Sequence, residues 1–435
     1  MNELKIGQKI NLEYGNQAEI IERLGSGGQG IVYKVRLNDK YYALKWYYFN
    51  KIKEPEKFRD NLAQNISDGS PNNMFLWPQY LTEFQEGSFG YIMELREKRF
   101  SSFSDVLNAR VRFADLEAIV NAALNIVSAF RALHGVGKSY QDLNDGGFFV
   151  DVSNGDIVVC DCDNVAADLS NFGIAGKPGY MAPEIVRGIA KPSVQTDKYS
   201  LAVILFKLFF RSDPLEGEKV LKSVCLTEEA EKKHYGSEAV FIYDPVNTAN
   251  RPVRGVHNNA IKFWPIFPQY IREAFIASFT EGLHKSEKRI IESQWQNLLV
   301  RLRGEIITCA CGYQQFLSDF ERDKDNKIIC GRCGTKYILP LGFVANKKYP
   351  VVLFPGVKLY KCHCEVGSAD NRTVMGEVVE NKMKKGLWGI KNLSADVWSI
   401  HLPNGTERKV GKNEVIPIFK EVEIDFGDGN ICRIS

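Results

Sequence analysis

Between residues 18 and 45 the chain alternates apolar and polar side chains around a glycine cluster, residues 25–30 (GSGGQG). Alternation with a period of two predicts β strands, and the aromatic-rich segment 41–46 is typical of a further strand. The glycine cluster therefore lies between two strands rather than between a strand and a helix. We expect an antiparallel sheet at the start of a domain.

Helical periodicity follows this predicted sheet. Apolar residues recur at helical spacing over residues 114–133, which predicts a helix with one buried face. Residues 199–209 are apolar on all sides, as expected of a helix buried in the centre of a lobe. Two further helical segments are predicted at 270–279 and 292–302. Strands followed by helices predict an α+β fold.

The character of the sequence changes after residue 303, where cysteine pairs appear, followed by short β-like runs separated by Gly, Asn and Asp. A chain of 435 residues is long for one hydrophobic core. We therefore predict a multidomain α+β protein with domains at 1–302, 303–340 and 341–435.

Composition argues against several classes of protein. The chain has 56 basic and 53 acidic residues, so no strong field attracts nucleic acid or an anionic membrane. The longest apolar stretch, 199–210, is too short to span a bilayer and contains Lys207. Ten cysteines without a signal peptide favour metal ligands or plain thiols over disulfides. These features predict a cytoplasmic protein, with a membrane role not expected and nucleic-acid binding disfavoured.

The glycine cluster and Lys45 suit phosphate binding. Glycines let the backbone lie close over phosphates, where its N–H groups meet negative oxygens. Lys45 follows one strand later, and its ammonium could reach the same phosphates. Taken singly, the glycines could form an ordinary turn and the lysine could be solvated. The hypothesis of phosphate binding therefore depends on the glycine cluster and Lys45 together.

Two aspartates suit phosphoryl transfer. Asp142 lies in YQDLN (140–144), and Asp161 follows an apolar run in VVCDCD (158–163), nineteen residues later. That separation accommodates a β-hairpin that brings both carboxylates into one cleft. Transfer to a hydroxyl needs one carboxylate to accept the proton and another to hold Mg²⁺, roles that suit Asp142 and Asp161 respectively. Alternatively, Asp142 caps a turn and Asp161 is a loop carboxylate.

A third cluster, GYMAPE at 179–184, precedes DKYSLAV at 197–203. With all motifs in this order and spacing, residues 18–300 resemble the eukaryotic-type protein kinases. The resemblance implies a two-lobed fold and transfer of the γ-phosphate of ATP, with Mg²⁺ or Mn²⁺, to a serine or threonine hydroxyl of a protein substrate. An alternative is a nucleotide-binding pseudokinase scaffold that uses its other domains for docking.

The resemblance also implies roles for individual residues. Asp142 would be the catalytic base, Lys45 would hold the α- and β-phosphates, and Asp161 would be the principal Mg²⁺ ligand. Gly25, Gly27 and Gly30 would form the loop that covers the phosphates. Val32 and Ala43 would enclose the adenine, and Met93 would be the gatekeeper. The backbone groups of Glu94 and Leu95 would contact the adenine edge. Glu184 with Arg289, and Asp197, match structural residues of the family.

Three departures from the family pattern concern the site. Gln141 replaces the arginine that pairs with an activation-loop phosphate, which puts that form of control in doubt. Gly147 stands where the family has the second metal ligand, an asparagine. Asn144, Asp145 or Asp163 would substitute, or only one metal would be held firmly.

The helix partner of Lys45 is also missing. Spacing points to Asp60 and Asn61, neither of which is the glutamate of the family, so we assign no residue to this role. Asp163 replaces the glycine of Asp-Phe-Gly, and its carboxylate would approach a metal or stiffen the loop.

Two cysteine pairs, Cys309 with Cys311 and Cys330 with Cys333, each precede a glycine. Twinned knuckles about twenty residues apart suit a tetrahedral Zn²⁺ site, and a segment this small needs metal to fold. We expect a structural zinc ribbon, with unligated thiols as the alternative. Residues 362–364 (CHC) lack a partner pair and are predicted to be alternating strand residues.

From about residue 351 the chain predicts strands and a hairpin near Gly405. This part resembles a divergent forkhead-associated β-sandwich, a phosphothreonine reader, although Glu377 replaces its phosphate-binding arginine and would repel phosphate. The whole arrangement is similar to bacterial kinases associated with tellurium-resistance-type systems. That resemblance implies a von Willebrand A domain protein and a metal-dependent protein phosphatase as partners.

Overall fold

The computed structural model describes residues 3–48, 51–85, 87–170, 176–223 and 227–435. The chain forms two compact units. The first comprises Met1–Ala114, Asn125–Ile261 and Ala274–Glu292, and the second comprises Asp115–Leu124, Lys262–Glu273 and Ser293–Ser435. The domain boundaries at 302 and 340 remain predictions.

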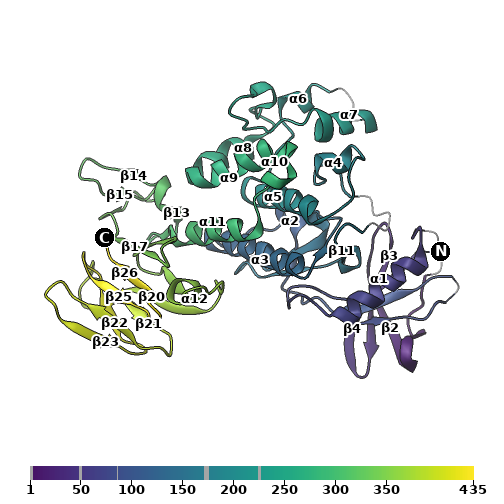
Figure 1. Cartoon of the computed structure of the whole chain (residues 1–435), viewed down its shortest axis with the longest axis horizontal. Helices are drawn as coiled ribbons and strands as arrows, with labels where there is room; N and C mark the ends of the chain where they lie inside the picture. Colours follow the sequence, from purple (N-terminus) through teal and green to yellow (C-terminus); the bar gives the residue numbers. More distant parts are fainter. Residues whose placement is uncertain (1–2, 49–50, 86, 171–175, 224–226) are drawn as a thin grey trace. The chain divides into compact units, whose positions relative to one another are not determined.

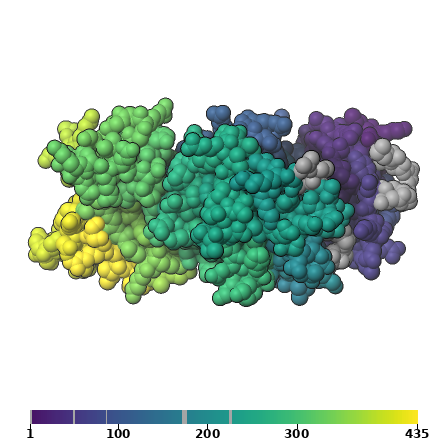
Figure 2. Space-filling model, turned by 90° about the horizontal axis from the view of Figure 1, so that it is seen from above, coloured from purple at the N-terminus to yellow at the C-terminus, as the bar shows by residue number. Residues whose placement is uncertain are grey.

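The first unit opens with the expected antiparallel sheet, in the strand order β1-β2-β3-β4-β6-β5. Its apolar side chains pack on both faces, and on one of them Phe58 and Leu62 of α1 (Pro55–Asp68) join the core. Helix α1 therefore lies across the sheet (Figure 1). The N-terminal strands of this sheet belong to the purple part of the surface in Figure 2. The strands are β1 (Lys9–Asn11), β2 (Gln17–Ser26), β3 (Gly30–Leu37), β4 (Lys40–Tyr47), β5 (Tyr80–Leu81) and β6 (Gly90–Glu94).

The predicted helices are present as α3 (Leu116–Gly135), α5 (Val194–Phe210), α9 (Gln269–Phe279) and α11 (Glu292–Gly304). Helix α5 is buried along most of its length, and the Ser193 hydroxyl and Thr196 form a capping box at its start. The shorter helices are α2 (Phe103–Leu107), α4 (Pro183–Val186), α6 (Glu218–Leu221), α7 (Glu228–Lys232), α8 (Asn258–Phe263), α10 (Glu281–His284) and α12 (Lys361–Cys364).

Helix α3 is long and apolar enough to cross a membrane by length and composition alone. In this structure 61% of its most apolar window is buried within the protein, as in the core helix of a globular domain. Among the described residues it is the one helix that meets this criterion.

A β-hairpin separates the two predicted site aspartates, as expected. Strand β9 (Phe148–Val150) pairs antiparallel with β10 (Ile157–Val159), and β7 (Ser101–Ser102) extends this sheet. The amide of Leu76 donates to the carbonyl of Val159, and the amide of Val159 donates to Met74, so the chain leading into β5 is tied to β10. A second small sheet pairs β8 (Lys138–Ser139) with β11 (Ala166–Ala167).

The second unit is rich in β structure. Two hairpin-like sheets carry the cysteine pairs: β12 (Ile306–Thr308) with β13 (Gln314–Phe316), and β14 (Glu321–Arg322), β15 (Ile328–Ile329) and β16 (Lys336–Tyr337). β17 (Gly342–Ala345) pairs with β18 (Tyr349–Val352). Two four-stranded antiparallel sheets follow, β19-β20-β21-β24 and β23-β22-β25-β26. Their strands are β19 (Lys358–Tyr360), β20 (Val374–Glu380), β21 (Trp388–Asn392), β22 (Trp398–His401), β23 (Glu407–Val410), β24 (Val415–Pro417), β25 (Glu423–Asp425) and β26 (Ile431–Arg433).

The predicted hairpin near Gly405 joins β22 to β23, and Gly405 has a positive φ of 82°. The strand prediction for residues 362–364 is wrong, because Cys362, His363 and Cys364 belong to the one-turn helix α12. A three-residue polar and apolar alternation fits either structure, and the ring of His363, which accepts a hydrogen bond from the Tyr360 amide at 3.0 Å, caps this turn.

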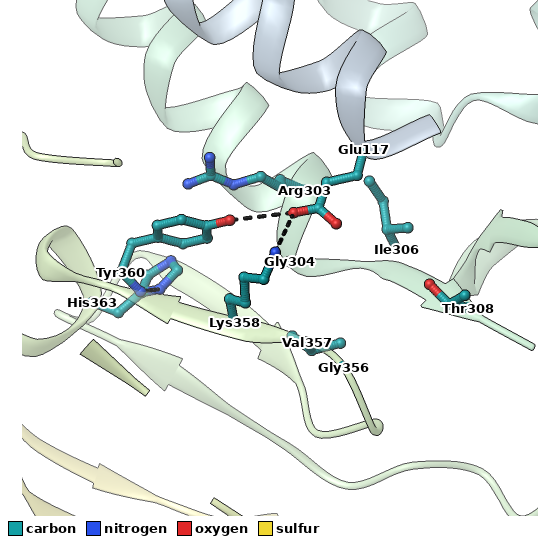
Figure 3. Close-up of a pocket in the computed structure, with 10 residues that line it drawn as sticks. All are labelled: Glu117, Arg303, Gly304, Ile306, Thr308, Gly356, Val357, Lys358, Tyr360 and His363. Carbon is teal, nitrogen blue, oxygen red and sulfur yellow. Dashed lines mark hydrogen bonds and ion pairs between the residues drawn. The ribbon is translucent and has the colours of Figure 1, made fainter. Parts of the chain in front are cut away.

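Arg303 is the central buried cation of the second unit (Figure 3). Its guanidinium lies 3.5 Å from the centroid of the Tyr360 ring and donates to Asn121 and to the carbonyl of Asn371. Glu117 accepts a hydrogen bond from the Tyr360 hydroxyl and lies 3.5 Å from the ammonium of Lys358, contacts that Figure 3 marks with dashed lines. These interactions tie α11, β19 and the start of α3 together.

Candidate active site

The structure brings the ammonium of Lys45 and the carboxylate of Asp161 together, at 2.9 Å. Lys45 is the sixth of the eight residues of β4, and Asp161 follows β10, so strands far apart in sequence converge here. Burial alone would lower the pKa of Lys45, but the charges of Asp163 and Asp161 outweigh it and raise this pKa above its ordinary value. Lys45 is therefore a permanent cation at this site.

Asp163 is the second partner of Lys45. Its side chain is fully buried, and its two oxygens lie 2.9 and 2.7 Å from the ammonium. The hydroxyls of Tyr47 and Tyr91 also donate to it, at 2.7 and 3.1 Å. Burial raises the pKa of both tyrosines, so their hydroxyls stay protonated and donate. Asp163 is thus a stiffening and charge-pairing group, and each of its oxygens is engaged within the protein.

Asp161 differs from Asp163 in exposure, since 44% of its side chain is accessible. Its backbone is left-handed, with φ of 48°, and so is that of Gln141, with φ of 68°. Such conformations cost about 1–3 kcal/mol for residues other than glycine and gather at functional sites. The strained turn after β10 leaves the Asp161 carboxylate accessible, which suits a cation ligand.

Asp142 lies near the start of the loop that joins β8 to the β9–β10 hairpin. Its Oδ1 accepts hydrogen bonds from the Asn144 side chain at 2.8 Å and from the Lys177 amide at 3.2 Å. Burial, together with a smaller effect of the charge of Asp161, raises the pKa of Asp142 to about 6 against the lowering effect of these hydrogen bonds. A carboxylate poised near neutral pH suits a general base.

The loop that carries Asp142 is held by Asp197 of α5. The carboxylate of Asp197 accepts from the amide of Tyr140 at 2.6 Å and from that of Gln141 at 3.3 Å. His134 lies between Asp197 and Glu292, at 3.2 and 2.7 Å. Burial alone would lower the pKa of His134, but these hydrogen bonds outweigh it and raise the pKa to about 9. At neutral pH a charged imidazole therefore braces the loop.

Gly147, where an asparagine was expected, has a steric cause. A Cβ at this position would lie 2.7 Å from the hydroxyl of Tyr140, which donates to the carbonyl of Cys160. Tyr140 itself replaces the usual histidine and is fully buried. The two departures from the family pattern are therefore coupled, because the tyrosine hydroxyl occupies the space that a side chain at position 147 would need.

The alternatives for a second metal ligand are already engaged. Asn144 donates to Asp142 and accepts from the Gly146 amide, and Asp145 accepts from Ser104 and Lys177. Asp163 is taken by Lys45 and two tyrosines. The arrangement favours one firmly held cation, at Asp161.

The glycine loop divides into two parts. A Cβ at Gly25 or Gly27 would meet no atom of the described residues within 4 Å, so none of these residues sterically requires glycine there. A Cβ at Gly30 would collide with the backbone oxygen of Trp46, so this glycine serves the close approach of β3 and β4. Open backbone at Gly25 and Gly27 fits the predicted approach to phosphates.

The residues predicted to enclose adenine lie together. Ala43 and Met93 are buried in one apolar cluster, against which Val32 and Leu95 pack, while Glu94 ends β6 with an exposed side chain. Sequence reasoning missed three members of this cluster that come from β9, β10 and the residue after it: Phe149, Val158 and Cys160. The uninterrupted apolar run of β10 is the signal that could have indicated Val158.

The predicted Glu184–Arg289 ion pair is bidentate, with distances of 2.7 and 2.8 Å. Arg289 is buried and also donates to the carbonyl of Gln195 at 2.8 Å. The pair links α4 to the segment before α11 and to the start of α5.

In the second unit the four predicted cysteines form one cluster. Their sulfur atoms all lie within 4.8 Å of one another, with Cys309 and Cys333 at 3.5 Å and Cys311 and Cys330 at 3.8 Å. Tetrahedral Zn–S bonds of about 2.3 Å place sulfurs about 3.8 Å apart, so the donor set fits zinc. Gly312 and Gly334, with φ of 79° and 73°, make the tight turns after each pair.

Comparison with known proteins identifies the family. The protein kinase domain model matches residues 18–262, more than half of the chain. The chain belongs to the protein kinase family. The family match is consistent with the arrangement of Lys45, Asp142 and Asp161 described above, and it confirms the fold class predicted for this part of the sequence.

Several kinases are similar to this chain. A probable cAMP-dependent protein kinase catalytic subunit of Encephalitozoon cuniculi is 29% identical over 208 residues, covering 45% of this chain and 61% of that protein. A dual specificity mitogen-activated protein kinase kinase of Caenorhabditis elegans is 26% identical over 210 residues, covering 44% of this chain and 45% of that protein. A probable serine/threonine-protein kinase of Dictyostelium discoideum is 26% identical over 210 residues, covering 45% and 24%. The chain thus spans less than two thirds of each relative, and the matches support the prediction of a protein serine/threonine kinase.

The raised pKa of Asp142 makes a prediction for the pH dependence of this kinase. The base acts only when it is deprotonated. Because its pKa is about 6 rather than the ordinary 3.8, the inactive protonated form persists to higher pH. The pH dependence of kcat/KM reports the ionisable groups of the free enzyme. We therefore expect kcat/KM to fall about tenfold between pH 7 and pH 5, with the midpoint of its acid limb near pH 6. Steady-state kinetics over pH 4.5–8 would measure it.

Asn144→Ala is the matched variant for this measurement. It removes a hydrogen bond that lowers the pKa of Asp142, so the acid limb should move to higher pH. A limb near pH 4 in the wild type, or no change in Asn144→Ala, would contradict the assignment of Asp142 as the titrating base.

Proposed function

We propose that this protein is an ATP-dependent protein serine/threonine kinase. The observation that supports the proposal is the 2.9 Å contact between Lys45 and Asp161, whose charge also raises the pKa of Asp142. Lys45 lies two residues after Ala43, which belongs to the apolar cluster suited to adenine. A bound Mg²⁺ would neutralise charge on the phosphates and bridge them to the protein. Asp161 would hold that cation, and Lys45 would contact the α- and β-phosphates.

The acceptor hydroxyl would approach Asp142. A shallow pocket beside this carboxylate is lined by Leu143, Lys177, Tyr180 and Met181. Leu143 and Met181 supply apolar contacts in this pocket, and the backbone N–H of Lys177 is held by its hydrogen bond to Asp142. Such a pocket suits a side chain of a peptide substrate. Asp142 would accept the hydroxyl proton as the oxygen attacks the γ-phosphate.

The alternative of a pseudokinase scaffold is less well supported. Three departures from the family pattern favour this alternative: Gly147, Gln141 and the absence of a glutamate partner for Lys45 on helix α1. Gly147 has a steric explanation in Tyr140, and Lys45 has a buried carboxylate partner in Asp163. None of the three departures removes the base or the principal cation ligand, and similar proteins include serine/threonine kinases.

The second unit would hold a structural Zn²⁺ and serve in docking. The sulfurs of Cys309, Cys311, Cys330 and Cys333 would be its ligands, and four thiolates leave no open position for catalysis. Tyr337 would orient this set, since its hydroxyl lies 3.2 Å from the sulfur of Cys309.

We propose a docking or regulatory role, rather than phosphopeptide reading, for the forkhead-associated-like β region. Gly376, aligned with a phosphate-binding motif, is explained by packing, since a Cβ there would lie 2.8 Å from the Trp398 ring. A von Willebrand A domain protein and a metal-dependent phosphatase in a bacterial signalling or tellurium-resistance system are partners proposed from resemblance. Cytoplasmic localisation is likewise proposed.

The kinase proposal is tested by transfer of labelled phosphate. Purified full-length protein incubated with γ-labelled ATP and Mg²⁺ or Mn²⁺ should label itself or a generic protein substrate at serine or threonine. Asp142→Ala and Asp161→Ala should each reduce labelling at least a hundredfold, because general-base catalysis contributes about 10²–10⁴-fold. Labelling of both variants at the wild-type rate would reject the assigned roles.

The zinc proposal is tested by metal analysis of the full-length protein. We expect one zinc per chain, a loss of zinc in Cys333→Ser, and a lower Tm after chelation, because metal binding supplies folding energy to such a small segment. Cys432→Ala, a buried thiol outside the cluster, is the control and should retain zinc. Wild-type protein without zinc, or zinc retained in Cys333→Ser, would contradict the assignment.

A further inference from the structure

Lys45 lacks a glutamate partner on helix α1. In protein kinases the ion pair between this lysine and a helix glutamate is the contact that regulation makes and breaks. Within the described residues, the ion pairs of Lys45 run to Asp161 and Asp163, both on the loop after β10. Helix α1 instead faces that loop with two amides, since Asn61 and Asn65 each donate to the carbonyl of Val165 at 2.8 Å.

Asp163 has the properties of a permanent anchor. It is fully buried, it pairs with Lys45 through both oxygens, and it receives the hydroxyls of Tyr47 and Tyr91. Tyr47 belongs to the same strand as Lys45, and Tyr91 belongs to β6, which pairs with that strand. The contacts that hold Lys45 therefore come from strands β4 and β6 and from the loop after β10, and they need no residue of α1.

We propose that Asp163 is the positioning residue that holds Lys45 for the phosphates in place of a helix carboxylate, so that movement of α1 is not the on–off switch of this kinase. The inference rests on the proposed function, because it concerns the lysine of the same nucleotide site. From the sequence, Asp163 could approach a metal or stiffen the loop, and no residue is assigned as the partner of Lys45. The inference gives the role of that partner to Asp163.

The anchor protects the cation site. Asp161 is the accessible carboxylate, yet its Oδ1 also lies 2.9 Å from Lys45. While Asp163 shares the ammonium, Asp161 can turn toward Mg²⁺ at little cost. Without the charge of Asp163, Lys45 would depend on Asp161 alone and would compete with the cation for that oxygen. Loss of the anchor should therefore appear as a higher Mg²⁺ requirement.

The test compares Asp163→Asn with Asn61→Ala in the full-length protein. Asp163→Asn preserves shape but removes the charge, and Asn61→Ala removes one tether of α1 to the loop. For Asp163→Asn we expect the Mg²⁺ concentration for half-maximal phosphate transfer, and the Kd of ATP in Mg²⁺, to rise about tenfold, which corresponds to about 1.4 kcal/mol. Asn61→Ala should change both by less than about twofold, with Tm recorded for each protein.

Tyr47→Phe covers the case in which Asp163→Asn does not fold. It removes one hydrogen bond to Asp163 and leaves Lys45 untouched, so it should shift the Mg²⁺ requirement in the same direction by a smaller factor. An unchanged Mg²⁺ requirement in folded Asp163→Asn, or in Tyr47→Phe if the former is unfolded, would overturn the inference. An equal shift in Asn61→Ala would also overturn it, because α1 would then share the anchoring role.

The binding measurement separates this inference from the proposed function. If the wild type binds ATP with Mg²⁺ but transfers no phosphate, the proposed kinase activity fails. The Mg²⁺ dependence of the Kd of ATP in the same variants still decides whether Asp163 anchors Lys45.

Discussion

The buried pairing of Lys45 with two aspartates is the interaction on which the rest of this site depends. A lysine side chain inside a protein is costly unless carboxylates surround it, and here Asp163 and Asp161 compensate for its burial. The pairing joins β4 of the sheet to the loop after β10, so it fixes the two sides of the nucleotide site relative to each other. The two aspartates differ in exposure. Asp163 is buried and pairs with Lys45, whereas Asp161 is accessible and would hold the cation.

The remaining elements of the first unit hold these charged groups in place. Helix α5 is buried and carries Asp197, which fixes two amides of the loop before Asp142. His134 is held as a cation between Asp197 and Glu292, so the brace is itself a buried charge network. The β9–β10 hairpin spans the gap between Asp142 and Asp161. The strained backbone at Gln141 and Asp161 persists because these surrounding contacts determine it.

Sequence reasoning could predict the parts of this structure that depend on local pattern or on ordered motifs. The antiparallel sheet, the buried helix α5, the hairpin between the aspartates and the cysteine cluster all follow from periodicity or from short spacings. It could not predict the partner of Lys45, because that choice depends on which of several carboxylates the fold buries. The meaning of Gly147 was likewise hidden, since only three-dimensional contact with Tyr140 shows that the two substitutions are coupled. Residues 362–364 were assigned to a strand because a pattern of three residues cannot distinguish a strand from a helical turn.

The central claim is that Lys45, Asp142 and Asp161 surround one nucleotide and its cation. Crystals grown with Mn²⁺ and a non-hydrolysable ATP analogue would test it directly, because anomalous scattering locates the manganese independently of the nucleotide. We expect manganese bound by Asp161, α- and β-phosphate oxygens within hydrogen-bonding distance of the Lys45 ammonium, and the γ-phosphate facing Asp142. Nucleotide or manganese bound elsewhere, with Lys45 remote from the phosphates, would contradict it.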